Sequence, residues 1–400
     1  MSHVYLIAYG CEPGLGGEAE VGWQTAVGLK RQGVELTAVT RKANAAAIMA
    51  AGEPCKPEFV FLESPLVKLK PRGRFSYFYY LCWQWTVWRY LRTRVKPDDI
   101  VHLLTFGNIM LPTFVGWLPC RLVLGPMGGG AVADPRLMSD PSWKRKAAFL
   151  FQRTIKKTFR FLPHIRHLLH RADVVIARTG ETLGMLPRFC RDKAVVMLET
   201  GVRKPSPPMR EYDGRMRRIV TVSRLIDTKN VDQVIEIYGM LKDRFPELTD
   251  LDVVGDGPCR EKLQKRYGDV PGVHFLGKVP HERIGDMLRR ADLFLFCSIK
   301  EGGSNALFEA AAAGLPIACY DVSGMTVFPP DAGAMKSCPK RSRRMENMRA
   351  LFRSISETFP DGEAVGKMVD RALKDMEDHY LWPSKCAYYK SCYDAVRTAL

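Results

Sequence analysis

The chain lacks the features of an exported or cross-linked protein. Its 11 cysteines are scattered over 400 residues and none forms a C-x-x-C pair. This spacing predicts reduced thiols that mostly fill space in a cytosolic protein. The start MSHVYLIAYG turns straight into a glycine loop, so we expect no secretory signal.

A long hydrophobic run is also missing. The longest stretch free of Asp, Glu, Lys and Arg covers residues 100–120, and histidine, glycine and proline interrupt it. Such residues suit a strand, a loop and a short helix better than a membrane span.

Acidic residues are absent from two long stretches, 67–96 and 142–171, which hold many of the lysines and arginines behind a net charge of +17. Both stretches lie in the first half of the chain. A one-sided basic surface attracts nucleic acid, anionic lipid or a phosphorylated substrate. The alternative is a solvated basic face that has no partner.

Short apolar runs alternate with helical patterns along most of the chain. The first half begins with a strand over 4–10, a helix over 18–32 and a strand over 34–40, and a second alternation covers 218–320. Between them, residues 201–215 hold three prolines and two glycines, which is typical of a linker. Alternating strands and helices predict parallel sheets, and 400 residues predict two domains.

We therefore expect an α/β protein with two doubly wound, Rossmann-like domains that face each other across a cleft. The predicted boundaries are 1–203 for the first domain, 204–217 for a linker and 218–375 for the second domain. Residues 376–400 are predicted to form a helix that crosses back to the first domain. In such sheets, ligands bind at the carboxyl ends of the strands.

Glycines join the first strand to the first helix at Gly14, Gly16 and Gly17. Glycines there let backbone N–H groups approach a phosphate at a helix N-terminus. The spacing is neither G-x-G-x-x-G nor a Walker loop, so it indicates neither a dinucleotide fold nor a P-loop. A plain tight turn explains the pattern equally well.

Two cations follow the first strand of the second half. Arg224 and Lys229 would suit a diphosphate, as an arginine fork and a lysine point charge, or they would belong to a solvated loop. The nearby VGDGP, residues 254–258, is a strand that enters a turn, and a structural turn is its simpler interpretation.

The stretch KEGGSNALFEAAAAGLP, residues 300–316, places two glutamates in an otherwise small and apolar run. Ser304 or Asn305 can cap a helix that ends before Gly314, which leaves Glu301 in the loop and Glu309 near the helix start. Ionised carboxylates accept hydrogen bonds from vicinal hydroxyls, such as those of a ribose or a sugar. Capping and solvation are the alternative.

Together these motifs resemble glycosyltransferase family 4, whose members have the GT-B fold, retain anomeric configuration and use nucleotide sugars without a metal. The resemblance lies in SRLIDTK (223–229), VVGDGP, HFLGKVP, ADLFLFCS, EGGSNALFEAAAAGLPIA with its E-x7-E pair, and in PGLGGEAEVGW, DIVH (99–102) and GPMGGG of the first half.

The resemblance implies a role for each matching residue. Arg224 and Lys229 would neutralise the donor diphosphate, and Glu301 and His102 would contact the transferred sugar. Further donor contacts would come from the ribose-binding Glu309, the backbone of Lys278 and Val279 near the base, the loop residues Gly302, Gly303, Ser304 and Asn305, and Gly16 and Gly17 at the β-phosphate. For His102, a core histidine at a strand end is the alternative.

The implied reaction moves a hexose-type sugar to a glycan or lipid-linked saccharide in cell-surface polysaccharide synthesis, with UDP favoured over GDP. We expect no cofactor or metal, because the cations replace one and no Asp-x-Asp pair is dedicated to it. Replacing Arg224 or Lys229 by alanine is expected to lower kcat far more than it alters folding.

Aromatic and basic residues gather at 75–90 and at 144–162. The simpler interpretation of 75–90 is a core helix, and the other is a surface that contacts an anionic membrane. We thus expect a cytoplasmic protein that contacts the inner face of a membrane. A GT-B epimerase or hydrolase is a second hypothesis, and a basic nucleic-acid-binding protein, which would need base-reading motifs, is a third.

Overall fold

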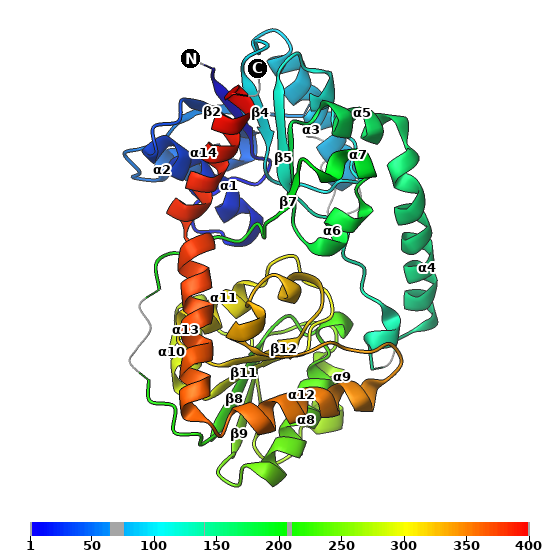
Figure 1. Cartoon of the computed structure of the whole chain (residues 1–400), viewed down its shortest axis with the longest axis vertical. Helices are drawn as coiled ribbons and strands as arrows, with labels where there is room; N and C mark the ends of the chain where they lie inside the picture. Colours follow the sequence, from blue (N-terminus) through cyan, green and yellow to red (C-terminus); the bar gives the residue numbers. More distant parts are fainter. Residues whose placement is uncertain (1, 65–75, 140, 206–209, 399–400) are drawn as a thin grey trace. The chain divides into compact units, whose positions relative to one another are not determined.

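The structure, a computed structural model, describes residues 2–64, 76–139, 141–205 and 210–398. The chain forms two compact units (Figure 1). The first contains Met1–Gly130, Thr154–Gly201 and Tyr380–Leu400, and the second contains Ala131–Arg153 and Val202–His379. Each unit has its own parallel sheet, as expected for two Rossmann-like domains.

The first unit is built on a seven-stranded sheet of order β3-β2-β1-β4-β5-β6-β7, in which every strand pair is parallel. The strands are β1 (Val4–Ile7), β2 (Leu36–Arg41), β3 (Glu58–Leu62), β4 (Ile100–Leu103), β5 (Arg121–Met127), β6 (Val174–Ala177) and β7 (Ala194–Val196). Its helices are α1 (Gly17–Arg31), α2 (Ala45–Ala50), α3 (Ser76–Leu91), α5 (Pro163–Arg171), α6 (Gly180–Met185), α7 (Arg188–Arg191) and α14 (Trp382–Thr398). The strand order reverses between β1 and β4, which makes the sheet doubly wound.

The second unit is built on a six-stranded parallel sheet of order β10-β9-β8-β11-β12-β13. The strands are β8 (Arg218–Val222), β9 (Asp250–Val254), β10 (Val273–Gly277), β11 (Leu293–Phe296), β12 (Ile317–Tyr320) and β13 (Met335–Ser337). The helices are α8 (Val231–Arg244), α9 (Arg260–Tyr267), α10 (His281–Arg290), α11 (Asn305–Ala312), α12 (Arg344–Thr358) and α13 (Gly362–His379). Here the strand order reverses between β8 and β11.

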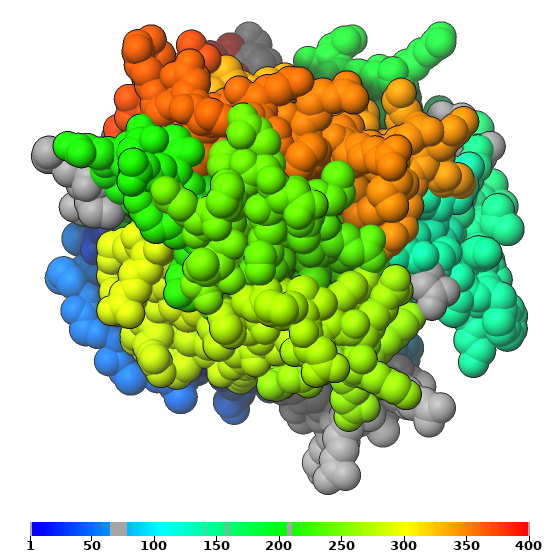
Figure 2. All heavy atoms as spheres, turned by 90° about the horizontal axis from the view of Figure 1, so that it is seen from below, coloured from blue at the N-terminus to red at the C-terminus, as the bar shows by residue number. Residues whose placement is uncertain are grey.

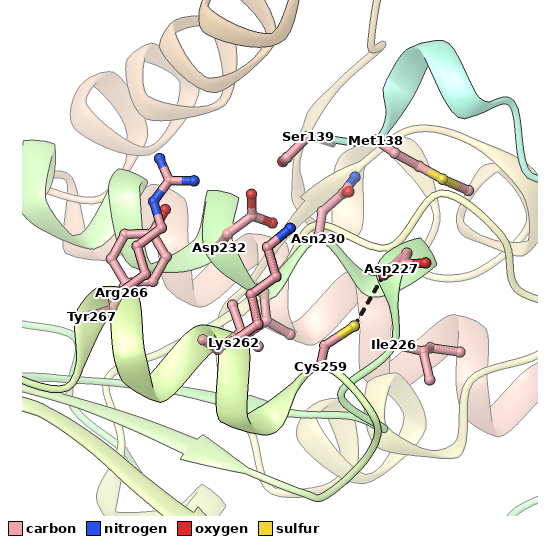
Figure 3. Close-up of a pocket in the computed structure, with 12 residues that line it drawn as sticks. Met138, Ser139, Ile226, Asp227, Asn230, Asp232, Cys259, Lys262, Arg266 and Tyr267 are labelled. Atoms are coloured by element: carbon pink, nitrogen blue, oxygen red, sulfur yellow. Dashed lines mark hydrogen bonds between the residues drawn. The ribbon is translucent and has the colours of Figure 1, made fainter. Parts of the chain in front are cut away.

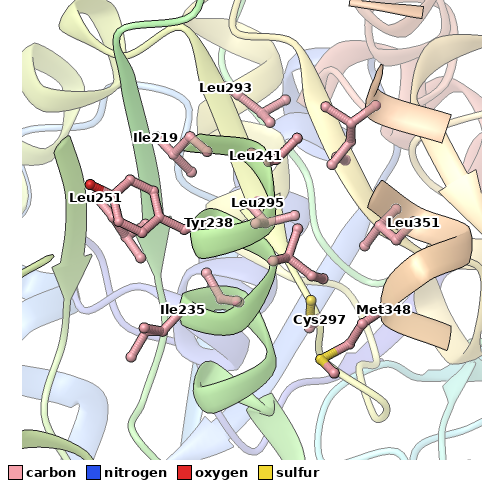
Figure 4. Packing of buried hydrophobic residues seen from close by; sticks show 14 of the residues in the cluster. Ile219, Ile235, Tyr238, Leu241, Leu251, Leu293, Leu295, Cys297, Met348 and Leu351 are labelled. Atoms are coloured by element: carbon pink, nitrogen blue, oxygen red, sulfur yellow. The ribbon is translucent and has the colours of Figure 1, made fainter. Parts of the chain in front are cut away.

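Apolar strand residues and helix faces form the core of the second unit. Leu293 and Leu295 of β11 lie among Ile235, Tyr238 and Leu241 of α8, and all five are buried (Figure 4). On the outer surface, the orange residues of α12 border the green residues of α8 (Figure 2). Strands buried on both faces read as continuous apolar runs, which is why the sequence patterns predict them well.

The charge-free stretch 100–120 forms β4, a loop and the short helix η3 (Val115–Trp117), as expected. Among the described residues, no helix is both long enough and apolar enough to cross a membrane. All eleven cysteines are free thiols, and seven of them are buried.

The units differ from the predicted boundaries in one segment. Residues 131–153, placed in the predicted first domain, group with the second unit. Met138 is buried in the core of that unit, Arg341 pairs with Asp134 at 2.9 Å, and the side-chain amide of Asn230 donates to the carbonyl of Leu137 at 3.0 Å. The predicted linker lies partly outside the described residues, at 206–209, and residues 210–217 form no helix or strand.

Candidate active site

The reversal of strand order in the second sheet brings two loops together. The loop after β8 carries Arg224 and Lys229, and the loop after its neighbour β11 carries Glu301. The carboxyl ends of neighbouring parallel strands lie at one edge of a sheet, and the point where the order reverses is where such sheets bind ligands. Residues that lie more than 70 positions apart in the sequence therefore meet in one place.

Glycines fix the loop after β8 against the loop after β9. Gly255 has φ +128°, and a Cβ there would lie 1.8 Å from the carbonyl oxygen of Ser223. The carbonyl of Asp256 accepts a hydrogen bond from the N–H of Leu225 at 2.9 Å. VGDGP is therefore a structural turn, as the simpler interpretation held, and its close packing holds the backbone on both sides of Arg224.

Lys229 and Glu301 form a buried ion pair. Lys229 ends the short helix η6 (Asp227–Lys229), and its Nζ donates to Oε1 of Glu301. Their side chains are only 10% and 11% exposed. The hydroxyl of Ser298 donates to the same carboxylate oxygen at 2.7 Å, and the hydroxyl of Ser323 donates to the backbone carbonyl of Glu301 at 2.8 Å. The structure thus brings the two predicted residues into direct contact and neutralises both charges locally.

Ser298 and Ser323 are the functional neighbours that sequence reasoning missed. Ser298 follows β11, and Ser323 follows β12 and has φ +59°. Both are at most 3% exposed. A buried serine after a strand has many structural explanations, so its spacing gave no signal that it would orient a carboxylate.

Arg224 differs from Lys229 in its surroundings. Its side chain is exposed, and among the described residues no carboxylate lies within salt-bridge distance of it. Its backbone carbonyl accepts from the N–H of Ile226 at 2.9 Å, so the loop is ordered while the guanidinium remains in solvent. This cation is therefore available to an anion without displacing an internal partner.

Helix α11 begins at Asn305, and its N-cap residue is Ser304. The Ser304 side chain makes no capping hydrogen bond, so it does not occupy the first N–H groups of the helix. Helix N-termini attract anions and hydrogen-bond acceptors for this reason. Gly302 and Gly303 form the loop between Glu301 and this N-terminus, as the sequence predicts.

Glu309 lies one turn into α11, with a side chain 31% exposed. Burial raises the pKa of its carboxyl above the ordinary value, and His281 at 3.9 Å opposes that shift. Lys278, which is exposed, and the half-buried Val279 follow β10. They precede α10, which begins at His281 and contacts α11.

A pocket beside η6 is lined by Ile226, Asp227, Asn230 and Cys259, among others, and none of its lining residues is a predicted donor contact (Figure 3). Asp227 accepts from the Cys259 thiol at 3.0 Å and pairs with Arg145 at 2.8 Å. The pocket therefore adjoins the predicted site at Asp227 without including it.

In the first unit, Gly16 and Gly17 have φ +75° and +55° and precede or begin α1. Nothing lies within 4 Å of a Cβ built at either position, so their backbone is open to a ligand. The left-handed φ values also satisfy the plain-turn interpretation.

His102 corrects the sequence-based expectation. It is completely buried in β4, where its Nε2 lies 2.7 Å from the carbonyl oxygen of Gly125 and its Nδ1 lies 2.6 Å from the hydroxyl of Tyr393. A carbonyl only accepts, so Nε2 carries the proton and Nδ1 accepts from the tyrosine. Neither ring nitrogen remains for a sugar, and His102 is the core histidine of the alternative interpretation.

Burial lowers the pKa of His102 from 6.5 to about 4. In the unfolded chain the ring protonates at its ordinary pKa, so the free energy of unfolding should fall as pH falls through this window. The shift corresponds to about 3 kcal/mol in total. We expect His102→Gln to lose this part of the pH dependence, measured by urea unfolding between pH 7 and about pH 4.

Activity separates the two roles of His102. A buried structural residue predicts that the folded His102→Gln variant keeps kcat within about threefold of the parent, since its side chain contacts no ligand. A hundredfold loss of kcat in a variant that is still folded would instead support the hypothesis that His102 contacts the sugar.

The aromatic stretch 75–90 mostly forms α3. Tyr79, Tyr80 and Trp83 are buried, which matches the core interpretation, whereas Phe78 and Trp85 are exposed. Phe75 lies outside the described residues. The ring of the exposed Trp85 stacks on the ring of Trp88, and the two ring centroids lie 4.7 Å apart.

Comparisons with known proteins find relatives in sequence and in fold. Residues 210–329 match the family of glycosyl transferases group 1. A human subunit of phosphatidylinositol N-acetylglucosaminyltransferase is 28% identical over 193 residues, which are 47% of this chain and 38% of that protein. The GtfA subunit of the UDP-N-acetylglucosamine–peptide N-acetylglucosaminyltransferase of Streptococcus parasanguinis is 31% identical over 144 residues, 35% of this chain and 28% of that protein. The matched regions span less than half the length of these relatives.

Solved structures share the fold over the whole chain. A sucrose-phosphate synthase from Thermosynechococcus elongatus has a TM-score of 0.67 at 15% identity and covers 100% of both chains. Anabaena HepE in complex with UDP has a TM-score of 0.60 at 14% identity, covering 99% of this chain and 100% of that one. These similarities give the GT-B fold, and the match of residues 210–329, together with the sequence relatives, supports a glycosyltransferase of the family 4 type that the motifs predict.

Proposed function

We propose that the chain transfers a hexose-type sugar from a nucleoside diphosphate sugar to a hydroxyl of a saccharide acceptor, with retention of anomeric configuration. The observation that carries the proposal is the ion pair of Lys229 and Glu301 where the order of the second sheet reverses, with the exposed Arg224 in the same loop as Lys229. Two cations beside a carboxylate suit a ligand with an anionic diphosphate next to a hydroxyl-rich sugar.

The chemistry follows from those charges. As the sugar–phosphate bond breaks, negative charge grows on the leaving diphosphate, and cations already aimed at it stabilise that state. Arg224 is unpaired within the described chain and can bind the diphosphate directly, whereas Lys229 would share its charge between Glu301 and the phosphate. The departing phosphate would accept the acceptor proton. Because these side chains supply the positive charge, we propose that the reaction needs no metal.

UDP is the proposed nucleotide. A relative is named for UDP-N-acetylglucosamine, and a neighbour in fold was solved with UDP. Glu309 would accept the ribose hydroxyls, and the backbone of Lys278 and Val279 would contact the base. The uncapped N-terminus of α11 would receive sugar or phosphate oxygens at Ser304 and Asn305.

The proposed acceptor is a glycan or a lipid-linked saccharide used in cell-surface polysaccharide synthesis. A relative that is named for transfer to phosphatidylinositol supports a lipid-linked acceptor. The exposed aromatic and basic residues of the chain would place the protein at the inner face of a membrane, on the cytoplasmic side.

Donor binding provides the direct test. In a thermal-shift screen of nucleotide sugars, we expect UDP-hexoses to raise the Tm of the parent protein. Glu309→Gln should weaken donor binding ten- to hundredfold, because a carboxylate accepts stronger hydrogen bonds than an amide. Since burial raises the pKa of Glu309, the donor Kd of the parent should also increase as pH falls, and this dependence should vanish in Glu309→Gln.

Glu357→Gln is the matched control, because this exposed carboxylate lies on α12 and belongs to no predicted contact. It should bind donor like the parent at each pH. The proposal fails if no nucleotide sugar stabilises the parent, and the ribose role fails if Glu309→Gln binds donor normally. A nucleotide sugar that binds and is converted without any saccharide acceptor would favour the epimerase or hydrolase instead.

A further inference from the structure

Helix α4 (Trp143–Thr158) has a clear separation of residue types. Trp143, Ala147, Leu150, Phe151 and Ile155 follow the i, i+4, i+7, i+8, i+12 spacing of one helix face. The opposite face carries Arg145 and Lys156, and Lys146 and Arg153 lie between the two faces. No acidic residue occurs in the helix or anywhere between residues 142 and 171. The helix is therefore amphipathic and strongly cationic.

The orientation of α4 is the reverse of that found in an ordinary surface helix. Three side chains on the side of the cationic face contact the rest of the chain: Arg145 pairs with Asp227 at 2.8 Å, Phe149 lies under the Arg136 guanidinium at 5.7 Å from the ring centroid, and Lys156 donates to the carbonyl of Gly130. The apolar face is the exposed one, with Trp143 and Phe151 74% and 67% exposed.

Exposing these apolar side chains to water costs free energy, and the contacts of the helix with the rest of the chain do not offset that cost. Thirteen of the fifteen α4 residues whose side chains are described are exposed, so burial in the protein contributes little to holding the helix. An exposed stripe of Trp, Phe and Ile gains free energy only when another apolar phase covers it. The stripe therefore calls for a partner outside the unit cores.

Charge decides which partner fits best. Lys144 lies at the edge of the stripe, and Lys146 and Arg153 lie exposed on its other side. Apolar residues centred on a cationic helix with Trp at the boundary are typical of helices that lie in the headgroup region of a bilayer. Sixteen residues give a helix about 24 Å long, enough to lie along such a surface.

We propose that the outward face of α4 is a docking surface for an anionic lipid bilayer, on which the helix lies in the plane of the headgroups. Trp143, Phe151 and Ile155 would enter the acyl boundary, while Lys144, Lys146 and Arg153 would meet lipid phosphates. The idea that this surface brings the protein to a lipid-linked acceptor rests on the proposed function. Vesicle binding itself requires no sugar transfer.

The test uses the full chain and flotation with vesicles of phosphatidylcholine, with or without a third of phosphatidylglycerol. We expect binding to the anionic vesicles that weakens as salt is added, because the cationic part of the interaction is screened. Trp143→Ser combined with Phe151→Ser should reduce the bound fraction at least tenfold without changing the Tm. Lys146→Gln combined with Arg153→Gln should reduce binding to anionic vesicles and leave binding to neutral ones unchanged.

The control combines Met49→Ser and Met345→Ser, two exposed apolar residues on α2 and α12, and it should bind vesicles like the parent. Equal binding by the Trp143–Phe151 variant and the parent would overturn the proposal. So would a parent that binds no vesicles but dimerises through this face, which would identify a second copy as the partner. Vesicle binding without any sugar transfer would contradict the proposed function alone.

Discussion

Replacing Arg224 by alanine should lower kcat at least a hundredfold while leaving the Tm unchanged. The guanidinium is exposed and has no salt-bridge partner in the described part of the chain, so folding does not depend on it. Its expected effect lies in the transition state, where a preorganised cation beside a leaving group contributes about 3 kcal/mol. Steady-state transfer or donor hydrolysis, with Tm measured in parallel, checks both halves of this prediction.

Two further variants sharpen the result for Arg224. Arg224→Lys keeps the charge but loses the planar fork, so it should recover only part of the activity. Arg349→Ala, an exposed arginine on α12 outside the predicted site, should behave like the parent. A parental kcat for Arg224→Ala would remove this residue from the mechanism.

The second large effect concerns Lys229 and Glu301. Because both side chains are about nine-tenths buried, removing either one leaves the other charge without its partner. Breaking such a pair costs about 3 kcal/mol, so Glu301→Gln and Lys229→Met should each lower the free energy of unfolding by about that amount. The sequence-based expectation that replacing Lys229 lowers kcat far more than it alters folding is thus joined by an expected loss of stability.

A double-mutant cycle separates structure from chemistry. The double variant Lys229→Met, Glu301→Gln removes both charges, so it should regain most of the lost stability. It should not regain activity, because the diphosphate would keep only Arg224 and the sugar would lose its carboxylate. Urea unfolding and kcat are the two measurements. If the double variant recovered both, the pair would be structural only, and if the single variants were as stable as the parent, the ion pair would be absent in solution.

Much of the fold could be predicted because parallel strands leave a strong signal. Runs such as 218–222 and 293–296 are continuously apolar, and each is followed by a loop with polar or glycine residues. The positions of three candidate residues could be predicted for the same reason: strand ends place Arg224 and Glu301, and the Ser–Asn pair at the start of α11 places Glu309 inside the helix. Local chemistry was sufficient for these positions.

The remaining features depend on contacts that have no local pattern. A strand buried on both faces shows no alternation, so the sequence could not tell that His102 points toward Tyr393, 291 residues later. The pairing of Lys229 with Glu301 joins residues 72 positions apart, and residues 131–153 join the second unit through the burial of Met138 and the ion pair of Asp134. Such pairings depend on the packing of the whole structure and not on the neighbouring sequence.

The return of the chain to the first unit has a consequence for synthesis. Tyr389 and Tyr393 of α14 are fully buried in the first unit's core beside Leu6, and a Cβ at Gly28 of α1 would touch the Cys386 sulfur at 2.4 Å. During translation, β1 and α1 leave the ribosome long before the helix that covers them. The first unit must therefore wait, incompletely covered, while the second unit is made. Although each unit has its own core, the order of synthesis makes the second complete first, so a chain stalled after residue 379 would carry a finished second unit and an open first one.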